Sequence, residues 1–174
     1  MSPREDPPAP SAEPAPPQDS SLPIAIGCDE AGYALKELIA EHLRARGREV
    51  TDYGTHSEQD REDYPDIAVM VAEAVARGEH ERGVLICGTG IGMSIAANKV
   101  PAVRAAQVAD TYSAERARKS NDAQIITMGA RTLGPELARS IIDAWLGSEF
   151  EGGRSAPKVE KLSALDERYG KTLP

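Results

Sequence analysis

Short apolar segments alternate along the chain with longer segments in which apolar positions recur three or four residues apart. The short segments predict strands, because brief runs rich in apolar and β-branched residues are typical of buried strands. They cover residues 24–27, 49–53, 83–86, 103–106 and 125–128. The longer segments predict amphipathic helices. These helices cover residues 35–43, 67–75, 91–99, 113–120, 137–146 and 156–169.

The regular alternation of strand and helix predicts one fold class, a three-layer α/β/α sandwich around a Rossmann-like parallel sheet. In such sheets ligands bind beyond the carboxyl ends of the strands. Asp29, Cys87 and Gly129 each directly follow a predicted strand. We therefore expect these three residues to gather at one edge of the sheet, where a site would form.

The two ends of the chain differ from this pattern. Residues 1–21 are dominated by Pro, Ala, Ser and acidic residues. This composition predicts a disordered tail ahead of a single domain over 22–174, because the tail buries too little apolar surface to offset its ordering entropy. A ligand of SH3-type domains is the alternative interpretation. The final predicted helix carries Val159, Leu162 and Leu165 on one side, and we expect it to pack on a neighbouring subunit.

Composition narrows the class of protein. Of 174 residues, 40% are hydrophobic, and the formal net charge is -8. This charge argues against binding to nucleic acid or to an anionic membrane surface. No apolar run approaches the roughly 18 residues of a membrane span. Cys28 and Cys87 lack a metal-ligand spacing, so we expect neither a metal site nor a disulfide, and we predict a cytoplasmic protein.

A glycine-rich loop joins the strand at 83–86 to the helix at 91–99. Its sequence is Cys87-Gly88-Thr89-Gly90-Ile91-Gly92-Met93-Ser94. Glycines let the backbone approach a ligand closely, and the N–H groups and dipole at a helix start favour negative charge. A cysteine beside a helix start also holds a larger thiolate fraction near neutral pH. A base beside an anion-binding loop suggests an enzyme.

Met93 excludes three common interpretations of this glycine loop (87–94). A Walker A loop requires lysine after its last glycine, a dinucleotide-binding loop requires its third glycine at this position, and a tyrosine-phosphatase loop requires arginine here. A glycine-rich turn with a buried structural cysteine remains as the alternative without chemistry.

Five motifs occur in an order and spacing that resemble one known family. They are Gly27-Cys28-Asp29, Asp63-Tyr64-Pro65, residues 87–99, Asn121-Asp122 and Gly152-Gly153-Arg154. Over residues 22–169 the chain resembles ribose-5-phosphate isomerase type B and the related galactose-6-phosphate isomerase subunits. The resemblance implies an aldose–ketose isomerase that uses neither metal nor cofactor and acts on a phosphorylated monosaccharide. It also implies a homodimer, or a dimer of dimers, whose active sites lie at the interface and take residues from both chains.

The chemistry of such an isomerase assigns roles to the glycine loop. Moving a proton between C1 and C2 through a cis-enediolate requires a carbon base, a group that handles the oxygen protons, and donors for the oxyanion. By resemblance Cys87 is the base and Thr89 hydrogen-bonds a substrate oxygen. Asp29 binds hydroxyls and assists oxygen proton transfer, or alternatively only caps the helix that follows it. The oxyanion would meet a nest of backbone N–H groups from Gly88, Gly90, Ile91, Gly92, Met93 and Ser94.

The resemblance also supplies residues for the rest of the substrate. Tyr64 and Asn121 would contact the sugar hydroxyls or the carbonyl. Arg131, Arg154 and Lys158 are the candidates for binding phosphate, arginine through paired hydrogen bonds and lysine as a point charge. Taken singly, each of these three is most often only a surface charge.

Two positions depart from the ribose-5-phosphate pattern. The family usually has histidine directly after the first aspartate and another, thought to open the furanose ring, just before Asn-Asp. Here these positions hold Glu30 and Ser120. Serine is a poor acid–base group at pH 7, and glutamate would repel a phosphate.

The loss of the ring-opening histidine has a chemical interpretation. A tetrose 4-phosphate cannot close a furanose ring through O4, so an enzyme for it has no ring to open. Residues 110–116 and 120–131 also resemble the erythritol-pathway branch of the family. We therefore expect interconversion of D-erythrulose 4-phosphate and D-erythrose 4-phosphate, with D-ribose 5-phosphate as the alternative substrate.

Two other classes of function stay open, a noncatalytic sugar-phosphate-binding subunit and a hydrolase with Cys87 as nucleophile. The presence of both Cys87 and Thr89 argues against the first. The sequence positions no histidine to activate the thiol, which argues against the second. The histidines, His42, His56 and His80, are expected to be surface residues.

Overall fold

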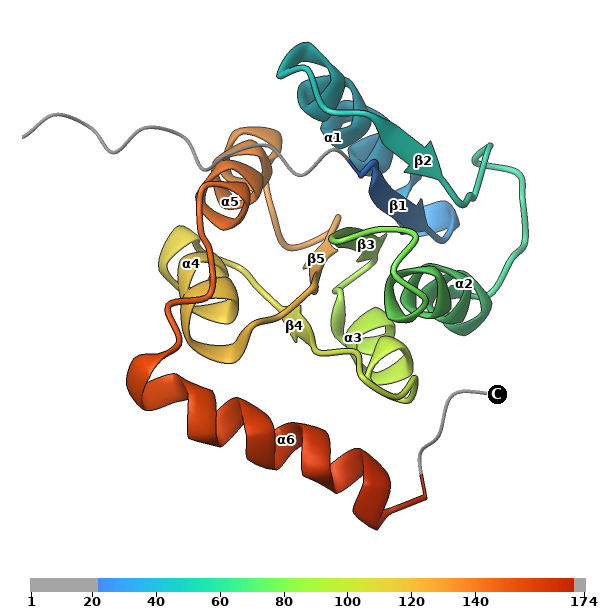
Figure 1. Cartoon of the computed structure of the whole chain (residues 1–174). Helices are drawn as coiled ribbons and strands as arrows, with labels where there is room; N and C mark the ends of the chain where they lie inside the picture. Colours follow the sequence, from blue (N-terminus) through green and yellow to red (C-terminus); the bar gives the residue numbers. More distant parts are fainter. Residues whose placement is uncertain (1–21, 171–174) are drawn as a thin grey trace, which may run out of the picture.

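A five-stranded parallel sheet forms the middle layer of the protein (Figure 1). The computed structural model describes residues 22–170, so the predicted tail over 1–21 lies outside the described residues. The strands are β1 (Ile24–Cys28), β2 (Val50–Asp52), β3 (Gly83–Cys87), β4 (Ala105–Gln107) and β5 (Ile125–Gly129). Their order is β2-β1-β3-β5-β4, each parallel to its neighbours. The predicted fold class is confirmed, although some strand ends differ from the predicted ones by one or two residues.

Helices cover both faces of the sheet (Figure 1). One face is covered by α1 (Tyr33–Ala45), α4 (Thr111–Asn121) and α5 (Pro135–Leu146). The other face is covered by α2 (Tyr64–Ala76) and α3 (Ile91–Ala97). A short 3-10 turn, η1 (Glu30–Gly32), leads from β1 into α1.

Each face of the sheet carries its own hydrophobic core. In β3, Val84 and Ile86 belong to one core, whereas Leu85 and Cys87 belong to the other, because successive strand residues point to opposite faces. All five residues of β3 are buried. A strand covered on both faces has no solvent side, so its sequence is a continuous apolar run rather than an alternating one.

A parallel sheet separates the ends of its strands from the ends of its helices. Each strand ends at the carboxyl edge, and the helix that follows carries the chain back to the amino edge. Cys87 pairs in register with Gly129, and Asp29 directly follows β1. These three residues therefore lie at the carboxyl edge, as predicted. Asn121, the last residue of α4 ahead of β5, lies at the amino edge.

The last helix, α6 (Ala156–Arg168), follows a 3-10 turn, η2 (Gly153–Ser155), and lies apart from the layers of the sandwich (Figure 1). It is tied to the rest through Asp166, whose Oδ2 accepts a hydrogen bond from the Ala102 N–H at 2.9 Å. Leu162 and Leu165 remain 42% and 41% exposed. Helix α6 therefore leaves part of its apolar side chains accessible to solvent. That a neighbouring subunit packs on them stays a prediction.

A buried lysine ties α1 to the segment that follows β2. Lys36 is fully buried, and its Nζ donates to Asp52 Oδ2 at 2.6 Å and to the Thr55 carbonyl at 2.7 Å. Burial of a cation is costly unless a partner compensates its charge, and here the Asp52 carboxylate does so. The Thr55 N–H in turn donates to the Cys28 carbonyl at 2.7 Å. The lysine thus holds the segment that borders the end of β1, next to Asp29.

Replacing this lysine should destabilise the fold. We expect Lys36→Met to lower the free energy of unfolding by about 3 kcal/mol, because the Asp52 carboxylate and the Thr55 carbonyl lose their charged donor. Urea denaturation at pH 7 measures the change. The matched control is Arg139→Met, which removes an exposed ion pair with Glu136 and should cost less than about 0.5 kcal/mol. Equal losses in the two variants would contradict the prediction.

Candidate active site

The glycine loop is folded tightly against the end of β5. Gly90 has a φ of 79°, and a side-chain carbon there would lie 2.9 Å from the backbone N and C atoms of Met128. Only glycine combines this left-handed conformation with so close an approach. The Gly90 N–H donates to Cys87 Sγ at 3.1 Å, and Thr127 Oγ1 donates to the Gly90 carbonyl at 2.7 Å. The sulfur of Cys87 therefore lies next to a backbone N–H group, which could donate a hydrogen bond to a thiolate.

A cation and a phenol lie directly against the backbone of this loop. The Arg131 N–H donates to the Gly88 carbonyl at 3.0 Å, and a side-chain carbon at Gly88 would lie 3.6 Å from Arg131 Cδ. The Tyr64 ring, at the start of α2, covers Gly92 so closely that a side-chain carbon there would lie 2.6 Å from the ring. Gly92 is thus needed for the Tyr64 ring to lie this close to the loop, whereas a side-chain carbon at Gly88 would make only ordinary contact with Arg131.

Asp29 completes this group at the carboxyl edge. Its Oδ1 accepts a hydrogen bond from the Gly32 N–H at 3.1 Å, so Asp29 caps the 3-10 turn η1, while the N-cap of helix α1 itself is Gly32. Burial, with a contribution from Glu30, raises the pKa of Asp29, while Arg131 and hydrogen bonds act in the opposite direction. A carboxyl group whose pKa is raised is better able to exchange protons near neutral pH. Capping and chemistry are therefore compatible in this residue.

The two cysteines have different surroundings. Cys28 and Cys87 belong to the cores on opposite faces of the sheet, and both are free thiols. Burial is the largest cause that raises the pKa of Cys28 to about 12, with Lys36 acting against it. Cys28 is thus held in its neutral form, and it is Cys87 that lies at the glycine loop.

A second set of predicted residues lies elsewhere. Ser120, Asn121, Arg154 and Lys158 together line a pocket of 350 Å³. Ser120 and Asn121 form the end of α4 and therefore belong to the amino edge of the sheet. Within one chain, the predicted residues thus divide into two groups, one around Cys87 and one around Asn121.

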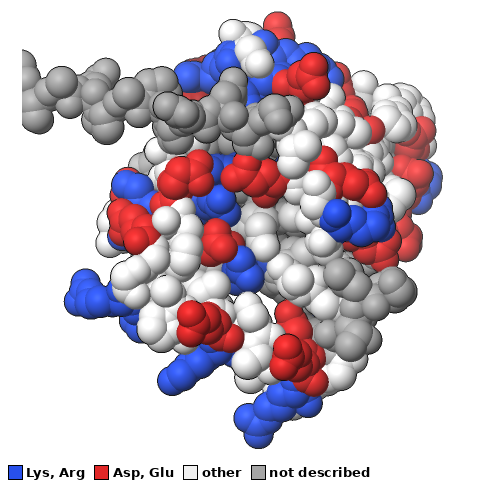
Figure 2. Space-filling model, in the orientation of Figure 1, with Lys and Arg blue, Asp and Glu red and all other residues white. Residues whose placement is uncertain are grey.

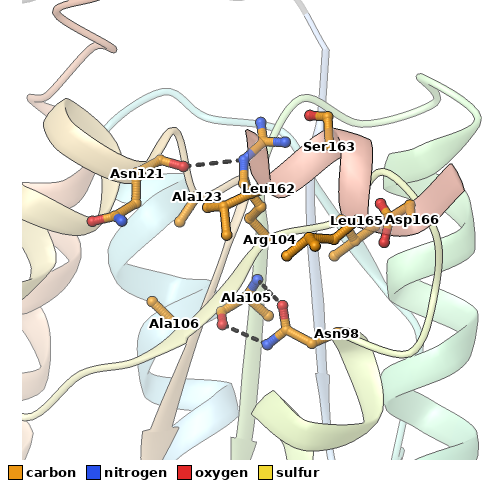
Figure 3. Close-up of a pocket in the computed structure, with 11 residues that line it drawn as sticks. Asn98, Arg104, Ala105, Ala106, Asn121, Ala123, Leu162, Ser163, Leu165 and Asp166 are labelled. Carbon is orange, nitrogen blue, oxygen red and sulfur yellow. Dashed lines mark hydrogen bonds between the residues drawn. The ribbon is translucent and has the colours of Figure 1, made fainter. Parts of the chain in front are cut away.

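A groove of 380 Å³ adjoins this second group, between α6 and the body of the protein (Figure 3). Leu162 and Leu165 of α6 line one side of it, and Arg104 lines the other. Arg104 Nε donates to the Asn121 carbonyl at 3.0 Å, which ties the end of α4 to the start of β4. The groove is therefore bounded by the same elements that carry the second group.

Acidic side chains outnumber basic ones, which gives the net charge of -8, but the two kinds are mixed over the surface drawn in Figure 2. Two cations in one small pocket, Arg154 and Lys158, are a local feature on this background. Such a pocket suits a small anion rather than a polyanion.

Comparison with known proteins places the chain in a family. Residues 24–162 match the ribose/galactose isomerase family. The chain belongs to this family. One relative, the D-erythrulose-4-phosphate isomerase of Pectobacterium atrosepticum, is 58% identical over 141 residues, which make up 81% of this chain and 93% of that protein. Another, the ribose-5-P isomerase B of Listeria innocua, is 53% identical over 147 residues, or 84% of this chain and 99% of that protein.

A solved structure supports the same assignment for the isomerase. The ribose-5-phosphate isomerase B of Clostridium thermocellum superposes with a TM-score of 0.83 at 50% identity, over 85% of this chain and 99% of that one. The protein is thus an aldose–ketose isomerase of the sugar-phosphate class. Among residues 22–170, no helix has the length and apolar character needed to span a bilayer, and no three His, Cys, Asp or Glu side chains form a group that could hold a metal ion.

One histidine of the isomerase, His80, is buried and His42 is half-buried, so the prediction that all three lie at the surface is wrong for His80. His80 is 5% exposed, and its Nε2 lies 2.9 Å from the Tyr53 hydroxyl. The His42 side chain is 15% exposed and lies 2.8 Å from the Asp143 carboxylate. Only His56, with a side chain 68% exposed, matches the prediction. Tertiary contacts decided these positions, because the rings of His80 and His42 each meet a polar partner that is distant in the sequence.

Two residues near the carboxyl edge were not predicted from the sequence. Gln107 Nε2 donates to the Thr89 carbonyl at 3.4 Å, and Lys36 is the buried lysine described above. Gln107 ends β4, so the rule that strand ends gather could have found it. Lys36 interrupts the apolar face formed by Leu35 and Ile39, and a charge at a core position of a helix signals a buried partner.

The two cysteines should differ in reactivity. At pH 8 we expect iodoacetamide to alkylate Cys87 and to leave Cys28 unmodified in the folded isomerase. The two thiols are both buried, but desolvation raises the pKa of the Cys28 thiol to about 12, so that this thiol is protonated well above pH 8. Cys87, 5% exposed, instead lies at the glycine loop on the carboxyl edge. Mass spectrometry of the labelled peptides makes the measurement, and a Cys87→Ser variant, which should take up no label, is the control. Alkylation of Cys28 at pH 8 in the folded protein would contradict the prediction.

Proposed function

We propose that the isomerase interconverts D-erythrulose 4-phosphate and D-erythrose 4-phosphate. The observation that carries this proposal is Ser120, which stands where a ring-opening histidine is expected, together with Glu30 in place of a second histidine. A tetrose 4-phosphate is open-chain, so it needs no ring-opening group. The 58% identity to a D-erythrulose-4-phosphate isomerase supports this choice. The alternative substrate is D-ribose 5-phosphate, which the similarity to a ribose-5-P isomerase B favours.

Cys87 is proposed as the carbon base. As a thiolate it takes the proton from C2 of the aldose, giving a cis-enediolate, and then returns the proton to C1. Backbone N–H groups of the glycine loop stabilise the charge that develops on oxygen. Asp29 and Thr89 move the proton between O1 and O2. The sulfur accepts from the Gly90 backbone rather than from a histidine, which favours a base over the nucleophile of a hydrolase.

Two copies of the chain are proposed to build each active site. The group around Cys87 lies at the carboxyl edge, whereas Asn121, Arg154 and Lys158 line a pocket at the other edge. A substrate of four or five carbons cannot contact both groups of one chain across the length of the strands between them. Arg154 and Lys158 of one copy would bind the phosphate of a sugar that reacts at Cys87 of the other.

Exposed apolar side chains support this arrangement. Ile91 and Ile95 of α3 are 56% and 58% exposed, and Leu162 and Leu165 of α6 are exposed as well. Helix α3 adjoins the group around Cys87, and helix α6 adjoins the group around Asn121. Pairing of two copies would therefore cover this apolar surface and also bring the two groups together. A homodimer, or a dimer of dimers, is the proposed assembly, and two free cysteines suit the reducing cytoplasm proposed as its location.

The substrate proposal predicts a preference between two sugars. The purified isomerase should show a larger kcat/KM for D-erythrose 4-phosphate than for D-ribose 5-phosphate. The reason is that Ser120 stands at the position of the ring-opening histidine and cannot open a furanose ring. NMR of each reaction measures both the rate and the product. A larger kcat/KM for the pentose would contradict the tetrose proposal and favour the alternative substrate. No turnover of either sugar would contradict both.

The shared site predicts complementation between inactive variants. Cys87→Ser should lower kcat at least about 100-fold by removing the base, and Arg154→Met should lower kcat/KM by weakening phosphate binding. Mixing the two variants under conditions of subunit exchange should restore about a quarter of the wild-type activity. Random pairing makes half the dimers mixed, and each mixed dimer has one intact site. Activity no higher than the sum of the separate variants would contradict a site built from two copies.

A further inference from the structure

Two buried arginines converge on one carboxylate at the amino edge of the sheet. Arg82 is 4% exposed and lies just ahead of β3. Its Nη1 donates to the Trp145 carbonyl at 2.7 Å, and its Nη2 donates to the Ser148 carbonyl at 2.9 Å and also pairs with Glu149. Arg118 of α4 reaches the second oxygen of Glu149 at 3.3 Å. We call Arg82, Arg118 and Glu149 the arginine latch.

The two arginines of the latch depend on nearby carboxylates to balance their charge. Burial is the main cause that lowers the pKa of Arg82, and the neighbouring Arg118 lowers it further, while Glu149 acts in the opposite direction. Glu81 and Asp122 also pair with Arg118, at 3.2 and 2.7 Å. Glu81 lies 4.0 Å from Arg82 and 3.2 Å from Arg118, but Glu149 is the carboxylate that pairs one oxygen with each arginine. Its loss leaves two closely spaced cations short of one negative charge.

The latch acts on the segment between α5 and η2. This segment, 147–152, carries the chain from the end of α5 to Arg154. Its Glu151 N–H donates to the Lys119 carbonyl at 3.1 Å, and Arg116 pairs with the Glu151 carboxylate at 3.4 Å. The segment is thereby fixed on the last turns of α4, one residue before Ser120. The latch and these contacts set where Arg154 emerges relative to the end of α4.

We propose that Glu149, through Arg82 and Arg118, is a positioning residue for phosphate binding by Arg154 and Lys158. Glu149 does not line the pocket that holds Arg154 and Lys158, and it lies at the opposite edge from Cys87. Its role is therefore to hold the phosphate-binding pocket in shape, with no part in the proton transfer. The inference rests on the proposed function, because it takes Arg154 and Lys158 as the residues that bind the phosphate.

The test separates binding from chemistry. We expect Glu149→Gln to raise KM for the preferred sugar phosphate about 10-fold while kcat changes less than about twofold. This combination is expected when a variant weakens binding of the substrate and of the transition state equally. The inhibition constant of inorganic phosphate, used as a probe of the pocket alone, should rise by a similar factor. The matched control is Glu136→Gln, which removes an exposed ion pair with Arg139 on α5 and should leave both constants unchanged.

A second variant covers the case in which Glu149→Gln does not fold. Glu149→Asp keeps the charge but is too short to reach both arginines, and it should raise KM and the phosphate inhibition constant by a smaller factor. Folded variants with wild-type values of both constants would overturn the inference, as would a fall in kcat with KM unchanged.

Arg154→Met distinguishes failure of the latch from failure of the proposed function. If Arg154→Met raises the phosphate inhibition constant and Glu149→Gln does not, the latch is overturned while the phosphate pocket stands. If Arg154→Met leaves that constant unchanged, the proposed phosphate pocket fails and the inference fails with it.

Discussion

The parallel sheet imposes the constraint on which the rest of this structure depends. A strand can pair with a parallel neighbour only if a helix first carries the chain back across the sheet. Residues that follow strands, such as Asp29 and Cys87, therefore lie at one edge. A residue that ends a helix, such as Asn121, lies at the other. The motifs of the family are thus divided in space between the two edges of the sheet. Their division is the reason for proposing that each active site takes residues from two copies.

Close backbone approach shapes the reactive edge. The glycine loop leaves no space for a side chain at Gly90, where Met128 is in contact, or at Gly92, where the Tyr64 ring lies. These contacts bring the Cys87 sulfur, the loop N–H groups and the Arg131 side chain into one small region. A site of this kind needs no large cleft within one chain, because its walls come from backbone and from the side chains of adjacent strand ends.

Buried cations perform the positioning at both edges. Lys36 fixes the segment beside Asp29 through Asp52 and Thr55, and Arg82 fixes the segment that leads to the second group. A buried charge must keep its partners, since an unpaired ion in the interior is costly. This requirement makes such contacts more specific in geometry than apolar packing. In the isomerase both cations hold loops, whose backbone would otherwise have few fixed contacts.

The sequence by itself determined the α/β alternation, the parallel sheet, the carboxyl-edge placement of Asp29 and Cys87, and the family. These follow from local periodicity, glycine chemistry and contiguous motifs, which a single chain displays along its length. Tertiary structure alone decided that Arg154 and Lys158 lie with Asn121, and that His80 is buried. Those outcomes depend on which distant segments meet, and no local pattern encodes the partner of a charged side chain on another element.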